Sequence, residues 1–324
     1  MPKAGKQVIL FLALMVFVIC FPMQIDALRI ATTLYEDLKK SALVGTGRIV
    51  HEQTDDGLTY FDLALGNIIY GRSSSATVSI VTVGETVKRK HGLTMSVSTG
   101  RVGYAIGEEV VVFLKKASPG NVGRTKLKGD LNYITVQKID LGGLEDREGY
   151  LAELDRLAET VDLTDIERRE SIFLDLLSSR NDPVVESAVK ELGSMKSRQA
   201  LTALSQLVHS GSGNVRFQVI DAMRQIGGKE AVSVIASALG DESPRIRSRA
   251  AGSLGWMGAK EAEDKLIGMF LAEDEDENVK VNVVLALGNM GSTKAVPILM
   301  DALNDETISR TLRGSIENAL RKLQ

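Results

Sequence analysis

The sequence predicts a multidomain chain, in which a small all-β barrel or sandwich is followed by an all-α solenoid. Three features of the 324 residues lead to this prediction. The chain opens with a basic and then apolar segment, continues with short β-rich runs between turn residues, and ends in a fourfold repeat. A fixed repeat period of about 30 residues is typical of stacked helical units, which usually bind other macromolecules.

The N-terminal segment has the pattern of a secretory signal peptide. Lys3 and Lys6 precede an apolar run from Val8 to Phe21, which is shorter than the roughly 20 residues of a membrane span. We therefore expect an exported protein, periplasmic or extracellular, with a candidate cleavage site at Ala27. The alternative is an uncleaved membrane anchor through residues 8–21.

Composition narrows the classes of function. The net charge is −3 and only 5% of the residues are aromatic, so we expect no nucleic-acid partner. Membrane contact is expected only through the N-terminal segment, if that segment is uncleaved. Cys20 is the only cysteine and lies in the leader, which leaves the rest of the chain without a thiol nucleophile or a cysteine metal site.

Short β-rich runs separated by Gly, Asp, Ser and Pro clusters predict a small β barrel or sandwich, preceded by a helix over residues 33–42. The runs "LVGTGRIV" at 43–50 and "GEEVVVFL" at 107–114 resemble strands of OB-like domains in exported bacterial proteins. That resemblance implies an OB-like fold and not an activity. The expected strands are Leu43–Val50, Tyr60–Leu65, Val78–Val83, Val110–Leu114 and Tyr133–Gln137.

The second half of the chain repeats a pair of helices four times. Each first helix carries three apolar residues on one face and ends at a hinge residue, and the hinges follow one another at intervals of 31, 31 and 33. Glycines after three hinges are expected to take the left-handed conformation that ends a helix. The hinges are Met195, Ile226, Met257 and Met290, the glycines are Gly227, Gly258 and Gly291, and a closing helix is expected over Thr307–Leu323.

The repeated runs, such as "SPRIRSRAAGSLGWMGAKEAEDKLIGMF", resemble the short bacterial HEAT-like repeat of the phycobilisome-lyase type. The resemblance implies a helical solenoid. We divide the chain into a signal peptide or anchor at 1–27, a β-rich OB-like domain at 28–140, a degenerate helical capping unit at 141–180, and HEAT-like repeats with a terminal cap at 181–324.

Basic residues recur in one slot of the first helices, at Arg216, Arg247 and Lys280. We expect them to form a ladder between units, for which the acidic loop residues Asp241, Asp276 and Asp305 could supply partners. The alternative is a basic stripe that binds an acidic partner. Two neighbouring features are interpreted structurally: Trp256 is expected to pack in its turn rather than stack on a ligand, and the acidic block 273–277 is expected to be a solvated turn rather than a calcium site.

These features favour an exported, non-enzymatic, protein-binding scaffold of the cell envelope. No catalytic motif is found, so we expect no enzyme activity, no catalytic residue, no metal and no cofactor. One alternative is an enzyme similar to the lyases that attach bilin pigments to cysteines of phycobiliproteins, which share such repeats but which export disfavours. Another is a ligand-binding β domain with accessory helices. The expected partner-binding residues are Arg245, Arg247, Arg249, Gln206, Ser233, Ser237, Glu263 and Asp301.

Overall fold

The computed structural model describes residues 33–55, 58–83, 103–117 and 132–323, which belong to one compact unit. The predicted leader, residues 1–27, lies outside the described residues. Within the described ranges, no helix combines the length and the apolar character needed to cross a bilayer.

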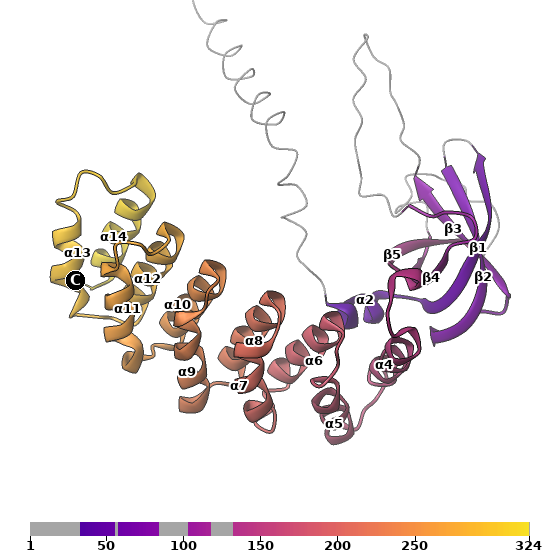
Figure 1. Cartoon of the computed structure of the whole chain (residues 1–324), viewed down its shortest axis with the longest axis horizontal. Coiled ribbons are helices and arrows are strands. Elements are labelled where there is room, and N and C mark those ends of the chain that lie inside the picture. Colours follow the sequence, from indigo (N-terminus) through magenta and orange to yellow (C-terminus); the bar gives the residue numbers. More distant parts are fainter. Residues whose placement is uncertain (1–32, 56–57, 84–102, 118–131, 324) are drawn as a thin grey trace, which may run out of the picture. The chain divides into compact units, whose positions relative to one another are not determined.

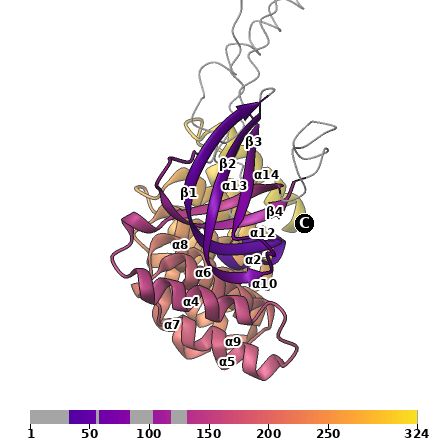
Figure 2. The same cartoon turned by 90° about the vertical axis from the view of Figure 1, so that its right-hand side faces the viewer.

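Five strands form a closed barrel, as the sequence predicts (Figure 2). The strand order is β1-β2-β3-β5-β4, and β4 also pairs with β1. Only β3 and β5 run parallel; the other neighbours are antiparallel. Within the described residues, the closing pair of β3 and β5 is the shortest, with Ser79 opposite Asn132 and Ile80 opposite Tyr133. The strands are β1 (Leu43–Asp55), β2 (Leu58–Gly71), β3 (Thr77–Val83), β4 (Glu109–Lys116) and β5 (Asn132–Asp140).

Alternating apolar residues fill the barrel. Leu43 faces Leu114 across β1 and β4, and Leu63 faces Val78 across β2 and β3. All four side chains are at most 1% exposed. This alternation is the period-two pattern that a half-buried strand requires, so the barrel interior follows directly from the sequence.

The helical region is a stack of antiparallel pairs. In Figure 1 the first helices of the repeats follow one another along one side of the stack, and the second helices along the other. The first helices are α6 (Asp182–Ser194), α8 (Gly213–Ile226), α10 (Pro244–Met257) and α12 (Glu277–Asn289). The second helices are α7 (Leu201–Ser210), α9 (Gly228–Ser237), α11 (Glu263–Leu271) and α13 (Ala295–Ala302). The pair α4 (Arg147–Glu159) and α5 (Ile166–Leu176) precedes them, and α14 (Arg310–Leu323) follows them. Three short 3-10 helices complete the region: η2 (Leu141–Gly143), η3 (Ala238–Gly240) and η4 (Lys260–Ala262).

A short helix ahead of the barrel, α2 (Leu34–Lys40), packs into the core of the helical region. The Tyr35 ring meets Phe173 edge-on, with 5.4 Å between ring centroids. Its backbone N–H donates to Ser187 Oγ at 3.2 Å, and its hydroxyl donates to the Thr160 carbonyl at 3.3 Å. Burial of this ring and satisfaction of its hydroxyl tie the segment before the barrel to helices more than 100 residues away.

Neighbouring first helices touch through glycine. A Cβ placed on Gly255 of α10 would lie 2.4 Å from Ala286 Cα of α12, and one on Gly193 of α6 would lie 2.7 Å from Ala222 Cα of α8. Gly288 of α12 meets Ala319 of α14 in the same way, at 3.1 Å. Only residues without a side chain allow backbones to approach this closely. The closing helix α14 therefore occupies the place of a further first helix.

The three glycines predicted to be left-handed all have positive φ; Gly258 adopts the left-handed conformation, whereas Gly227 has a ψ of −172° and does not. Gly227, Gly258 and Gly291 have φ values of 74°, 65° and 68°. The corresponding residue of the first repeat is Lys196, which has a φ of 55° and is the only such non-glycine residue in the described chain. The geometry of the turn is thus maintained even where the sequence lacks glycine.

Candidate functional site: a basic and aromatic groove

A groove of about 640 Å³ runs over α10 between α8 and α12. Two of the expected partner-binding residues, Arg245 and Arg249, line it. Its lining combines arginines, two aromatic rings and small polar side chains: Phe217, Arg224, Pro244, Arg245, Ser248, Arg249, Gly252, Ser253, Trp256, Asp276, Asn278 and Asn282.

The floor of the groove is one face of α10. Arg245, Arg249, Gly252 and Trp256 follow one another at intervals of three and four residues, the spacing that aligns side chains on one face of a helix. Nothing lies within 4 Å of a Cβ placed on Gly252. A helix-interior glycine costs about 0.5–1 kcal/mol relative to alanine, and here it leaves the floor open.

Trp256 stands beside the groove and is 69% exposed. The expectation that it packs in its turn is wrong, because most of the side chain is exposed to solvent. The Arg224 guanidinium lies 4.9 Å from the ring centroid, at the distance of a cation–π contact. An exposed indole held beside a guanidinium is a stacking surface for a planar ligand.

A second aromatic ring lies towards the other end of α10. Phe217 of α8 lies 4.4 Å from the guanidinium of Arg245 and 4.8 Å from that of Arg249. Arg249 is oriented further by Asp221, which accepts from its Nε at 2.8 Å. Two arginines thus share one ring, and their planes are pre-arranged before a ligand arrives.

Three arginines and one acid, Asp276, line the groove, and Asp221 pairs with both Arg224 and Arg249. Arg245 is exposed and donates to the neutral Asn214 Oδ1 at 3.2 Å, so its charge remains available to a ligand. Glu186 of α6 lies close to the same residues. Burial, and then the charge of Asp182, raise the pKa of Glu186 above its ordinary value, although the hydrogen bond from Asn214 and the charge of Arg245 act to lower it. Guanidinium groups bind carboxylates through paired N–H donors, so the groove suits a planar, conjugated carboxylate.

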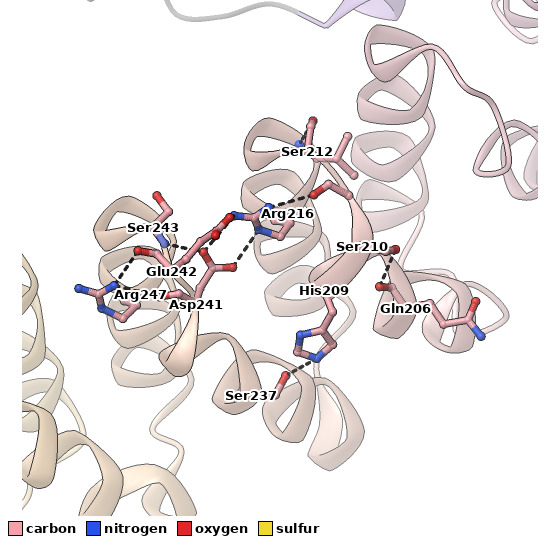
Figure 3. Close-up of polar contacts among 12 residues, drawn as sticks. Gln206, His209, Ser210, Ser212, Arg216, Ser237, Asp241, Glu242, Ser243 and Arg247 are labelled. Atoms are coloured by element: carbon pink, nitrogen blue, oxygen red, sulfur yellow. Dashed lines mark hydrogen bonds and ion pairs between the residues drawn. The ribbon is translucent and has the colours of Figure 1, made fainter.

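Arg247 points to the ladder and does not line the groove. Its Nε donates to Glu275 at 3.0 Å and its terminal nitrogen to the Asp241 carbonyl at 2.8 Å. Arg216 donates to Asp241 Oδ1 at 3.1 Å, which confirms that predicted pair (Figure 3). The acid that binds Arg247 is Glu275 and not Asp276, since Asp276 instead caps α12.

The other predicted binding residues lie on second helices, away from the groove lining. Ser237 Oγ of α9 lies 3.1 Å from His209 Nε2 of α7 and thereby links two repeats (Figure 3). Glu263 does not offer the exposed side chain that partner binding requires, since it is 9% exposed and pairs with Lys294 at 3.4 Å. The remaining three are exposed on α7, α9 and α13: Gln206, Ser233 and Asp301.

Acids of the block 273–277 serve neighbouring elements. Glu275 accepts from Arg247, Asp276 accepts from the N–H groups of Asn278 and Val279, and Glu277 accepts from Ser309 at 2.6 Å. Across the residues that the structure describes, no three His, Cys, Asp or Glu side chains are grouped so that they could hold a metal ion. The block joins the ladder to α12 and α14.

The helical region consists of HEAT-like repeats. The family described as HEAT repeats matches residues 170–245, 204–271 and 232–321. A curated relative, the uncharacterized phycocyanin operon protein Z of Pseudanabaena tenuis, is 23% identical over 157 residues, which are 46% of this chain and 77% of that protein.

Solved structures with similar helices include the complex of CpcE and CpcF of phycocyanin lyase from Nostoc sp., at 21% identity and a TM-score of 0.41. That match covers 48% of this chain and 65% of the lyase chain, slightly less than two thirds of its length. Human deoxyhypusine hydroxylase is 17% identical with a TM-score of 0.31, over 56% of this chain and 82% of that one.

These comparisons correct two predictions. The prediction of a non-enzymatic scaffold of the cell envelope is wrong, and so is the expectation that the chain is not an enzyme. The finding that overturns them is the similarity to a curated protein of a phycocyanin operon. The predicted export disfavours the bilin-lyase alternative, and Arg224 and Phe217 are not among the residues predicted to bind a partner. A comparison of repeat slots points to Arg224, because Gly193, Gly255 and Gly288 occupy its position in the other units.

Proposed function

We propose that this chain is a bilin-lyase-like protein, and that the groove on α8, α10 and α12 holds the bilin while it is joined to a cysteine of an acceptor protein. The observation that carries the proposal is the meeting of Trp256 and Phe217 with three arginines in one open groove. The curated relative from a phycocyanin operon supports the same class of ligand.

Two chemical features of a bilin match the side chains that line the groove. A linear tetrapyrrole is a flat conjugated system that carries carboxylates, so it can stack on aromatic rings and pair with guanidinium groups. From Arg245 to Trp256, α10 rises by about 16 Å at ~1.5 Å per residue. Such a length provides both a stacking surface and charge partners along an extended ligand.

The acceptor protein has to supply the reacting thiol. Cys20 is the only cysteine of the chain and lies in the predicted leader. The acceptor cysteine must therefore reach a bilin in the groove, and the open position of the groove over α10 allows this approach. We propose a protein partner on these grounds, with the groove serving to bind and orient the pigment.

Two further features of the chain remain proposals. We propose that the barrel is OB-like, which its strand order β1-β2-β3-β5-β4 supports. Export is a separate proposal, based on the basic and apolar pattern before residue 28, and it competes with the lyase proposal because it would separate the chain from a pigment and an acceptor that stay inside the cell. Fractionation of cells that express the full chain tests export, since recovery of the protein in the cytoplasmic fraction would contradict it.

Trp256 makes the ligand test direct, because it is the only tryptophan of the chain and it lies in the groove. Titration with phycocyanobilin should quench its fluorescence to saturation. Incubation with pigment and an apo-phycobiliprotein should then yield pigment that stays with the acceptor on a denaturing gel.

A charge-matched pair of variants separates the groove from general electrostatics. Arg245→Glu should weaken pigment binding about tenfold, which corresponds to ~1.4 kcal/mol. Lys229→Glu makes the same charge change on α9, at an exposed position outside the groove lining, and should bind pigment like the parent chain. Equal binding by the parent chain and both variants, or no saturable quenching, would refute the groove as the site.

A further inference from the structure

We infer that Arg224 is a positioning residue that creates the groove by holding α8 away from α10. The inference rests on the proposed function for its ligand, and its structural half stands without any ligand. It starts from the glycine contacts that join the other first helices. In those contacts a glycine backbone lies directly against an alanine of the next first helix: Gly193 on Ala222, Gly255 on Ala286 and Gly288 on Ala319.

The contact between α8 and α10 breaks this rule. Arg224 takes the slot of the glycine, and Ser253 takes the slot of the alanine. The two helices pack less extensively on each other than α6 on α8, α10 on α12 or α12 on α14. The glycine contacts leave no room for a Cβ, whereas Arg224 brings one of the longest side chains to the same place. Close packing of the two backbones is thereby prevented at this interface alone of the four.

The side chain of Arg224 is held in the space that it opens. Its guanidinium lies 4.9 Å from the centroid of the Trp256 ring, and its terminal nitrogen lies 3.8 Å from Asp221 Oδ1. Ser253 of α10 is 3% exposed, and both residues line the groove. The groove thus includes the one of these four first-helix interfaces that lacks the glycine contact, and it extends from there over α10 to α12.

The double variant Arg224→Gly with Ser253→Ala rebuilds the glycine–alanine pair of the other interfaces. In the full chain without ligand, it should bring α10 against α8 and shield Trp256, so that acrylamide quenches its fluorescence less than in the parent chain. Biliverdin, used as the bilin probe, should bind at least about tenfold more weakly, or ~1.4 kcal/mol.

A second variant separates spacing from charge. Arg224→Met keeps a long side chain without the guanidinium, so acrylamide quenching should stay at the parent level while biliverdin binding weakens. This variant also tests the inference if the double variant does not fold. If acrylamide quenches Arg224→Met as little as it quenches a buried indole, Arg224 does not set the spacing of the two helices.

The remaining outcomes separate the two proposals. If acrylamide quenches the double variant and the parent chain equally, Arg224 does not set the spacing, and the inference is wrong. If the parent chain does not bind biliverdin but the double variant shields Trp256, the proposed ligand is wrong while the positioning role of Arg224 is supported.

Discussion

Lys196 is held by the fold in a backbone conformation that residues with a side chain rarely adopt. Its φ of 55° lies in the left-handed region, where a side chain costs roughly 1–2 kcal/mol. Its N–H donates to the Gly193 carbonyl, and the next N–H, of Ser197, donates to Leu192. Gly258 and Ala259 repeat both bonds at the end of α10. Gly291 and Ser292 make the same two bonds at the end of α12, whereas Gly227 at the end of α8 donates to the Met223 carbonyl instead. The turn is therefore fixed by hydrogen bonds that three of the four repeats share.

Lys196→Gly should stabilise the protein by about 1 kcal/mol, because glycine adopts positive φ without strain. Lys196 is exposed, so its removal should disturb little packing. Thermal unfolding measures the effect, and the reverse change Gly258→Lys is the matched control, expected to lower the melting temperature. Unfolding of Lys196→Gly at or below the parent temperature would show that the turn is not strained.

Arg247 is a residue whose role differs from that of its neighbours. It was predicted both as a ladder residue and as a candidate for partner binding, and its contacts to Glu275 and two backbone carbonyls place it between two repeats. Arg247→Ala would leave Glu275 buried without its partner and should cost about 2 kcal/mol in unfolding free energy.

Urea denaturation measures this loss, with Arg245→Ala as the control. Arg245 lies on the same helix but is exposed, so its removal should change stability by less than about 0.5 kcal/mol. Equal losses in the two variants would contradict a ladder role that is specific to Arg247.

At the scale of the element, α10 carries two glycines with opposite roles. Gly255 lies against Ala286 of the next first helix, whereas Gly252 faces open space three residues earlier. Both residues lower helix propensity equally, so any difference between them reports on packing between helices. The pair distinguishes a glycine required by the stack from one that leaves the groove floor bare.

Gly255→Ala should destabilise the protein by about 1–3 kcal/mol, because the new methyl group overlaps the backbone of α12. Gly252→Ala should instead stabilise it by about 0.5–1 kcal/mol through helix propensity. Chemical denaturation of the two single variants checks both signs. Two changes of the same sign would contradict the packing contact between α10 and α12.

At the scale of the whole molecule, α2 connects the segment before the barrel to the first repeat. Lys190 of α6 donates to Glu36 of α2 at 2.5 Å, across 154 positions of sequence. Burial opposes the charged form of Glu36, but Lys190 and the Thr33 backbone N–H outweigh it, so the pKa of Glu36 lies below its ordinary value of 4.5. The charged carboxylate therefore stabilises the folded state.

This pKa predicts a pH dependence. A lowered pKa in the folded state contributes stability above pH 4.5, and this contribution is lost as the pH falls through the lower folded value. Glu36→Gln should therefore melt below the parent chain at pH 7, and the difference should vanish in acid. The exposed Glu317→Gln on α14 is the control; a difference for Glu36→Gln that persists undiminished at low pH would contradict the ion pair.

Local patterns were enough to predict most of the elements. The five β-rich runs became the five strands, and the apolar slots of each repeat became the buried faces of α6, α8, α10 and α12. Periodicity works here because a strand or helix buries the face that its own sequence makes apolar. The ion pair of Glu263 could not be predicted in this way, because its partner Lys294 lies on the next repeat.

The sequence by itself determined the β-then-α order, the repeat and the positive-φ glycines, since these depend on contacts within a few residues or on spacing along one helix. Only the tertiary structure decided which face carries the site. Arg224 and Trp256 are 32 positions apart and meet only because α8 and α10 are neighbours in the stack. The exposure of the tryptophan and the opening of the groove follow from the distance between two helices, which no local pattern encodes.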